Sequence, residues 1–211
     1  MTAEAASHAW AGLGVGLALA SAPGPVQAVL MGEAVRGGLG RGLRAMAGAN
    51  VTFGLLLVSL ALGLSVATPT GGALRVLKVA GGGLLLWLAA EGFRSQPDRE
   101  GGRADGHTLP PVVRGALAVL LNPGAWLFLG TVASSLFAAA SHSAGREGAV
   151  VAALALVVGL AMGDGAVVFL GGVGVRRAGE RTGRWVRRIL AVVLAGLGLW
   201  LLFSGLVSKG G

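Results

Sequence analysis

One acidic residue lies deep inside an apolar stretch of this sequence. Asp164 stands in the segment GLAMGDGAVVF, about seven residues from the end of the stretch, or roughly 10 Å along a helix axis. Burying a carboxylate in hydrocarbon costs free energy, so an acidic residue at this depth indicates a functional role. A group that is costly to ionise suits reversible proton uptake. The alternative is a structural carboxylate, paired with an arginine that reaches in from a neighbouring polar loop.

Two other apolar stretches, SAPGPVQAVL and LLNPGAWLFL, are each interrupted by a Pro-Gly pair. Their helix-breaking and polar residues are Pro23, Gly24, Pro25, Gln27, Asn122 and Pro123. Proline removes a backbone donor, and a carbonyl freed in hydrocarbon must find another partner. Paired interruptions at corresponding places indicate the central binding site of a transporter. Each proline alone could instead be an incidental kink.

Asn50 and Thr52 are further polar residues in an apolar stretch, where each could line a cavity or simply hydrogen-bond a neighbouring helix. The chain has no cysteine, and its three histidines show no ligand-like spacing. No nucleotide-binding motif and no nucleophile–base pair placed for catalysis occurs. We therefore expect no metal site, no cofactor and no enzymatic activity.

The composition predicts an all-α membrane protein with a single domain over residues 1–211. The sequence is 54% hydrophobic and only 12% charged, whereas soluble domains average about 25% charged residues. A membrane-spanning helix needs about 20 mostly apolar residues. Six ranges meet this length: 8–31, 45–66, 74–93, 112–139, 148–171 and 187–207.

The basic residues predict the orientation of these spans. Thirteen of the 17 Lys and Arg residues fall beside the first, third and fifth loops. Because cytoplasmic loops carry the basic excess, we expect a multi-pass protein of the inner membrane with both termini outside the cytoplasm. The net charge of +8 is explained by this topology, so no nucleic-acid partner is expected.

The spans divide into two groups of three, which are repeat one (about 8–93) and repeat two (about 112–207). Since three is odd, the second group enters the membrane in the opposite sense to the first. Pro23 and Pro123 lie near the centre of the first span of each group. The sequence therefore predicts six transmembrane helices arranged as two inverted three-helix repeats.

Several segments resemble the LysE/RhtB family of amino-acid exporters, in order and spacing along essentially the whole chain. These are PGP followed by RGGLGRGLRAMAGA, then LRVLKVAGGGLLLWLAAEGFR, then VRGALAVLLNPGAWLFL. The resemblance implies a secondary transporter that exports a small solute, an amino acid or a derivative. Phe53 and Gly124 stand where the family often has an acidic residue and a lysine. Both departures argue against a basic amino acid as the substrate.

We thus expect the substrate to bind near the midplane, against the two helix breaks and Asn50, with Asp164 carrying the coupling proton. The other partners expected are the bilayer and, as an open question, a second copy of the chain. Two alternatives remain: an exporter of a lipid-linked or other non-amino-acid solute, and a membrane assembly or regulatory protein that transports nothing. Glu33 and Glu91 are expected to form solvated ion pairs with Arg36 and Arg94, three residues further along.

Overall fold

The computed structural model describes residues 3–64, 69–94 and 109–207, and every regular element within these ranges is helical. The elements are α1 (Ala3–Ser21), α2 (Pro25–Ala61), α3 (Gly71–Arg94), α4 (Pro111–Leu120), α5 (Pro123–Phe128), the π-helical turn η1 (Leu129–Ala133), α6 (Ser134–Phe169), the π-helical turn η2 (Leu170–Gly174), α7 (Val175–Arg177) and α8 (Glu180–Val207). The prediction of helices throughout therefore agrees with the structure over this part of the chain.

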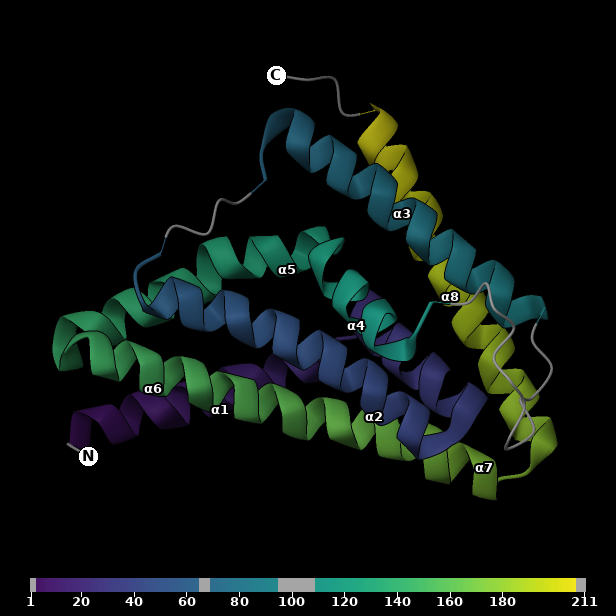
Figure 1. Cartoon of the computed structure of the whole chain (residues 1–211), viewed down its shortest axis with the longest axis horizontal. Helices are drawn as coiled ribbons and strands as arrows, with labels where there is room; N and C mark the ends of the chain where they lie inside the picture. Colours follow the sequence, from purple (N-terminus) through teal and green to yellow (C-terminus); the bar gives the residue numbers. More distant parts are fainter. Residues whose placement is uncertain (1–2, 65–68, 95–108, 208–211) are drawn as a thin grey trace.

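Two of the helices are hairpins, because α2 and α6 each reverse direction at a glycine (Figure 1). A straight helix of 37 residues, the length of α2, would extend about 55 Å, well beyond a hydrocarbon core of about 30 Å. In α2 the reversal occurs at Gly37 and Gly38, and Gly38 has φ 77°. In α6 it occurs at Ala144 and Gly145, with φ 66° at Gly145. Glycine adopts these positive φ angles without steric cost.

Four helical runs in the described part of the chain are long and apolar enough to cross a membrane. They are Pro25–Ala61, Gly71–Phe93, Pro123–Gly174 and Arg181–Val207. Large apolar side chains cover their outer faces, as Leu55, Leu127 and Trp200 show with 66%, 67% and 64% exposure. Helices with apolar exteriors suit a lipid environment, since all their backbone groups can pair internally. The prediction of an all-helical membrane protein is confirmed at this level.

The limbs of the hairpins pack against helices from the other half of the chain. Helix α1 lies along the second limb of α6, residues 146–169. A Cβ added at Gly16 would collide with the carbonyl oxygen of Leu156, and one at Gly159 with that of Leu13. The two backbones therefore touch, as is common where small residues line a membrane helix interface.

The same kind of contact joins α4 to the second limb of α2, residues 39–61. A Cβ added at Gly115 would collide with the carbonyl oxygen of Ala45, and one at Gly48 with that of Val112. In each half of the chain, the helix before the Pro-Gly break thus packs against the second hairpin limb of the other half.

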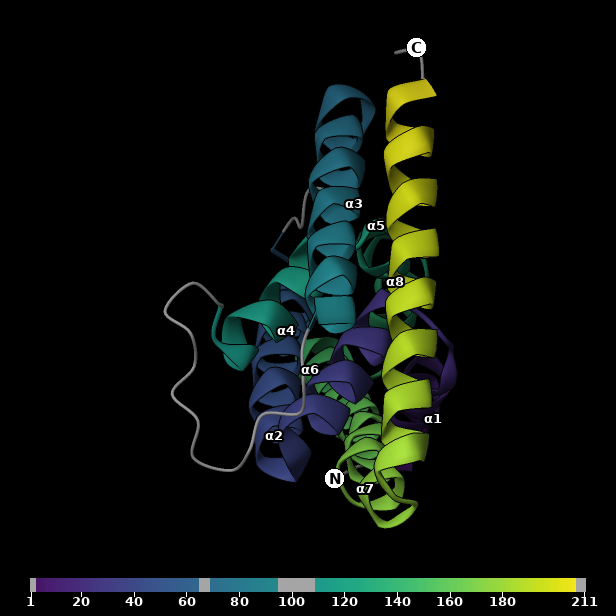
Figure 2. The same ribbon diagram turned by 90° about the vertical axis from the view of Figure 1, so that its right-hand side faces the viewer.

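Helices α3 and α8 form a third pair and lie side by side (Figure 2). A Cβ at Gly82 would lie 2.7 Å from the carbonyl oxygen of Gly198, and a Cβ at Gly198 would lie 2.9 Å from that of Gly82. The closest approach of this pair is therefore reciprocal, with one glycine from each helix.

Candidate transport site

The chain between α1 and α2 is a short non-helical link, in line with the break predicted at the first Pro-Gly pair. Helix α1 ends at Ser21, and Gly24 is extended with φ −165° and ψ −179°. Pro25 then occupies the first position of α2, where its missing N–H costs nothing and its fixed φ suits a helix. The backbone N–H groups of Val26 and Gln27 lack a partner among the described residues, so this helix start carries unpaired donors.

The second break separates α4 from α5. Asn122 is the N-cap of α5, and its side-chain oxygen accepts a hydrogen bond from the backbone N–H of Gly124 at 3.0 Å. The indole Nε1 of Trp126 donates to the carbonyl oxygen of Leu120 at 2.8 Å. A carbonyl near the break thereby gains a partner, as a non-aqueous environment requires.

The two breaks border one cavity, with a volume of about 250 Å³, which we call the central cavity. Its lining residues come from α1, α2, α4, α5, α6 and the two breaks: Leu19, Ala22, Pro23, Gly24, Pro25, Val26, Gln27, Ala49, Asn50, Phe53, Val119, Asn122, Gly124, Ala125, Leu160 and Asp164. Pockets for drug-sized ligands occupy about 300–1,000 Å³. The central cavity therefore suits a small solute.

Asp164 is the charged residue of this lining, and it is 1% exposed. Gln27 donates to its Oδ1 from Nε2 across 3.4 Å. Asn50 is 8% exposed, and neither atom of its amide has a hydrogen-bond partner among the described residues. Buried amides are normally paired. Asn50 thus presents its amide to the cavity that Asp164 also lines.

Most of the site residues predicted from the sequence meet in the central cavity. These are Pro23, Gly24, Pro25, Gln27, Asn50, Asn122 and Asp164. Pro123 does not line it, because as the first residue of α5 it lies on the other side of the break. Their roles in binding and coupling remain predictions. Within the described part of the chain, no group of three His, Asp or Glu residues could hold a metal ion.

Pro123 lines a second cavity of about 520 Å³, the adjoining cavity, between α5, η1, α3 and α8. It shares Pro25, Asn122 and Gly124 with the central cavity, so the two meet at the helix breaks. Its walls are largely apolar, and Lys78 is the charged residue among those that line it.

The expectation of a solvated pair was wrong for Glu33, because its pair with Arg36, at 3.7 Å, is buried. The expected partner of Glu91, the side chain of Arg94, lies outside the described residues. Glu33 is 3% exposed, and both carboxylates bind Arg114, which is 0% exposed. The described ion pairs join five residues, which we call the charge cluster: Glu33, Arg36, Arg41, Glu91 and Arg114. Arg114 stands just inside a predicted span, and a basic residue at that place was the available signal.

Arg114 is the centre of the charge cluster. Its Nη1 lies 3.0 Å from Oε1 of Glu33 and 2.8 Å from Oε2 of Glu91, and its Nη2 donates to Oε1 of Glu91 at 2.8 Å. Its Nε donates to the carbonyl oxygen of Leu109 at 2.8 Å, and the guanidinium carbon lies 5.1 Å from the ring centroid of Trp87. Such a planar, multiply paired guanidinium is the form in which a buried charge is tolerated.

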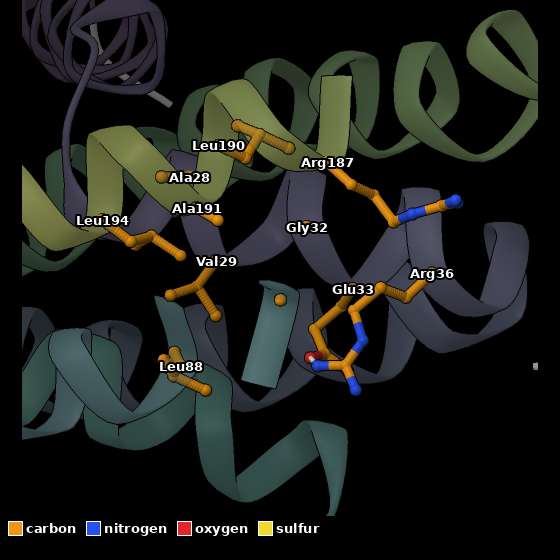
Figure 3. A pocket seen from close by; sticks show the side chains of 11 residues that line it. Ala28, Val29, Gly32, Glu33, Arg36, Leu88, Arg187, Leu190, Ala191 and Leu194 are labelled. Carbon is orange, nitrogen blue, oxygen red and sulfur yellow. Dashed lines mark ion pairs between the residues drawn. The ribbon is translucent and has the colours of Figure 1, made fainter. Parts of the chain in front are cut away.

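Arg36 and Arg41 tie the cluster across the reversal of α2. Arg36 donates from Nη2 to Oε1 of Glu91 at 2.8 Å, while Nε of Arg41 lies 2.6 Å from Oε2 of Glu33. Beside them is a pocket of about 30 Å³ between α2, α3 and α8, with Glu33, Arg36 and Arg187 at its polar end (Figure 3). It is large enough for about one water molecule, so it is no solute site.

The chain was compared with models of known protein families, with curated proteins and with solved structures. The model of the family described as LysE type translocator matches residues 17–205, which is nearly the whole chain. No curated protein and no solved structure matched the chain in the corresponding searches.

Proposed function

Because the chain belongs to the LysE type translocator family, and is thus a multi-pass membrane transporter of small solutes, we propose that it is a secondary exporter whose solute site is the central cavity. The solute is an amino acid or a derivative, and export proceeds across the inner membrane. The observation that carries this proposal is the meeting of both helix breaks, Asn50 and Asp164 in one small cavity.

We propose six membrane spans in two inverted repeats, with the hairpins of α2 and α6 each contributing two limbs. The reversals support this. Gly37 and Gly38 have φ, ψ of −122°, 16° and 77°, −174°, and Ala144 and Gly145 have −127°, 16° and 66°, −171°. The two reversals share their backbone angles closely, as expected for related hairpins.

The glycine contacts support the same symmetry. The contact of α1 with the second limb of α6 corresponds to that of α4 with the second limb of α2, and the reciprocal contact of α3 with α8 maps onto itself. This register places Phe53 opposite Asp164, and both line the central cavity. One of the two symmetry-related positions thus holds an acid and the other a phenyl ring, which favours a single coupling group.

The polarity of the central cavity favours a zwitterion. The start of α2, with unpaired N–H groups at Val26 and Gln27, carries the positive end of a helix dipole and suits a carboxylate. Asp164 suits an ammonium group, and Asn50 can bond either end. The absence of a second acid among the lining residues leaves no partner for the extra charge of a basic amino acid.

Proton coupling at Asp164 follows from its burial. The Asp164 side chain is 1% exposed, accepts a hydrogen bond from Gln27 at 3.4 Å and belongs to none of the described ion pairs. A solute ammonium would stabilise the ionised form. Solute binding and proton release are therefore linked, which is the requirement for exchanging one against the other.

Proteoliposomes loaded with labelled amino acids test the proposal. With an imposed pH gradient, we expect export by the parent protein, and at least a tenfold loss of gradient-driven export in Asp164→Asn. Glu147→Gln is the matched control, because Glu147 is an exposed acid on α6 and its loss should leave export unchanged. Normal gradient-driven export by Asp164→Asn would make Asp164 structural. No export of any amino acid by the parent would favour a lipid-linked or other solute, or a role without transport.

A further inference from the structure

The charge cluster joins three helices, and two of them, α2 and α4, also line the central cavity. Glu33, Arg36 and Arg41 belong to α2, Glu91 to the last turn of α3, and Arg114 to the first turn of α4. Helix α4 also packs closely against the second limb of α2, through the glycine contacts described above. A solute that passed between α2 and α4 at this end would have to separate these ion pairs.

The other end of the central cavity is different. There it meets the adjoining cavity at Pro25, Asn122 and Gly124. None of the described ion pairs involves a residue that lines either cavity at this end. The structure is therefore closed at the charge cluster and continuous with a larger cavity in the opposite direction.

The proposed symmetry shows that the closure belongs to one side only. In α2, Glu33 and Arg36 precede the reversing glycine; at the same distances before the reversing glycine of α6 stand Ala140 and Ser143. Neither of these corresponding residues carries a charge. Ser143 instead shares a single hydrogen bond with Nε2 of His8 on α1, at 2.5 Å.

Two further members of the cluster, Glu91 and Arg114, have uncharged counterparts as well. Arg114 precedes the contact glycine of α4, and the residue before the corresponding glycine of α1 is Val15. In the register set by the contact of α3 with α8, Val207 corresponds to Glu91. A repeat that needed these charges for folding alone would be expected to carry them in both copies.

A buried ion network is suited to reversible closure. The attraction between its opposite charges is offset by the free-energy cost of removing those charges from water. When the helices separate, water returns to the same charges and compensates for the contacts that are lost. The closed and open arrangements can therefore lie close in free energy, whereas an apolar seam of the same size would lose its contacts and gain exposed apolar surface.

We propose that the charge cluster is the gate at one end of the central cavity, with Arg114 as its central residue, and that the structure is the state in which this gate is shut. The predicted topology places this gate at the cytoplasmic face. The inference rests on the proposed function, because a gate implies a solute that passes it.

Thiol labelling in membrane vesicles tests the gate, since the chain has no native cysteine. Ala22→Cys places a thiol on the lining of the central cavity. Vesicles of both orientations are treated with the membrane-impermeant reagent methanethiosulfonate ethyltrimethylammonium. In this background we expect Arg114→Met to raise the labelling rate from the face of the charge cluster at least tenfold. Arg36→Gln, a milder change, should raise it by a smaller factor.

Arg44→Gln is the matched control, because Arg44 is an exposed arginine in the same limb as Arg41 and should leave labelling unchanged. Should Arg114→Met fail to fold, Arg36→Gln decides. Unchanged labelling from the cluster face in the folded variants, or an equal rise in the control, overturns the gate. Labelling needs no transported solute, so a failure of export and a failure of the gate are separate results.

Discussion

The contact between α3 and α8 leads to a prediction about two adjacent glycines. A Cβ at Gly82 would lie 2.7 Å from the carbonyl oxygen of Gly198, 2.8 Å from Cγ of Leu202 and 3.0 Å from its backbone nitrogen. The neighbouring Gly83 has open space at the same point. Gly82→Ala and Gly83→Ala thus make the same chemical change on the same helix, with and without a neighbour in the way.

The magnitude follows from the geometry. Ordinary contact begins near 3.4 Å, so α3 and α8 must separate by about 0.7 Å at Gly82. Overpacking of this kind costs about 1–3 kcal/mol, against about 1 kcal/mol gained when alanine replaces glycine in a helix. Gly83→Ala should keep the gain without the cost. The two variants should therefore differ by about 1–3 kcal/mol, with Gly83→Ala the more stable.

The assay is thermal unfolding of the purified protein in detergent, followed by tryptophan fluorescence. At about 2–4 °C per kcal/mol for a chain of this size, Gly82→Ala should melt roughly 2–12 °C below Gly83→Ala. Gly82→Ala with Gly198→Ala should cost less than the two changes separately, because helices already parted for one methyl group accept the second more easily. Equal melting temperatures for Gly82→Ala and Gly83→Ala would refute the close backbone contact.

Two further predictions concern the second helix break and the topology. Asn122→Ala removes the acceptor for the N–H of Gly124 and should lower stability by about 1 kcal/mol, measured as a lower melting temperature; no change would mean that another group caps α5. Reporter fusions after Gly71 should report the outside and those after Gly179 the cytoplasm, and the reverse pattern, or the same side for both, would contradict the predicted orientation.

The helices, the helix breaks and the buried acid could be predicted from the sequence, because each depends on the chemistry of neighbouring residues. Long apolar stretches form membrane helices because the backbone must pair internally in lipid. A proline beside a glycine interrupts such a helix, because proline has no backbone N–H to donate. The link around Pro23 and the cap at Asn122 are therefore where the sequence predicts them. Asp164 is conspicuous for the same local reason, as a charge in an otherwise apolar run.

Tertiary structure decided what these residues meet. Asp164 and Gln27 are 137 residues apart, and only the packing of the second limb of α6 beside the first break brings them together. Pro123 shows the opposite outcome, since its pattern matches Pro23 but the direction of α5 turns it toward the adjoining cavity.

The charge cluster shows most clearly why sequence was insufficient. Glu33 and Arg36 are neighbours on one turn, which predicts a solvated pair, yet Glu33 is buried because Arg114, 81 residues away, lies against it. Whether a charge is solvated depends on which helices cover it, and here α4 brings Arg114 against a residue 81 positions away. Local sequence therefore determined which groups are charged or polar, and helix packing determined which of them water can reach.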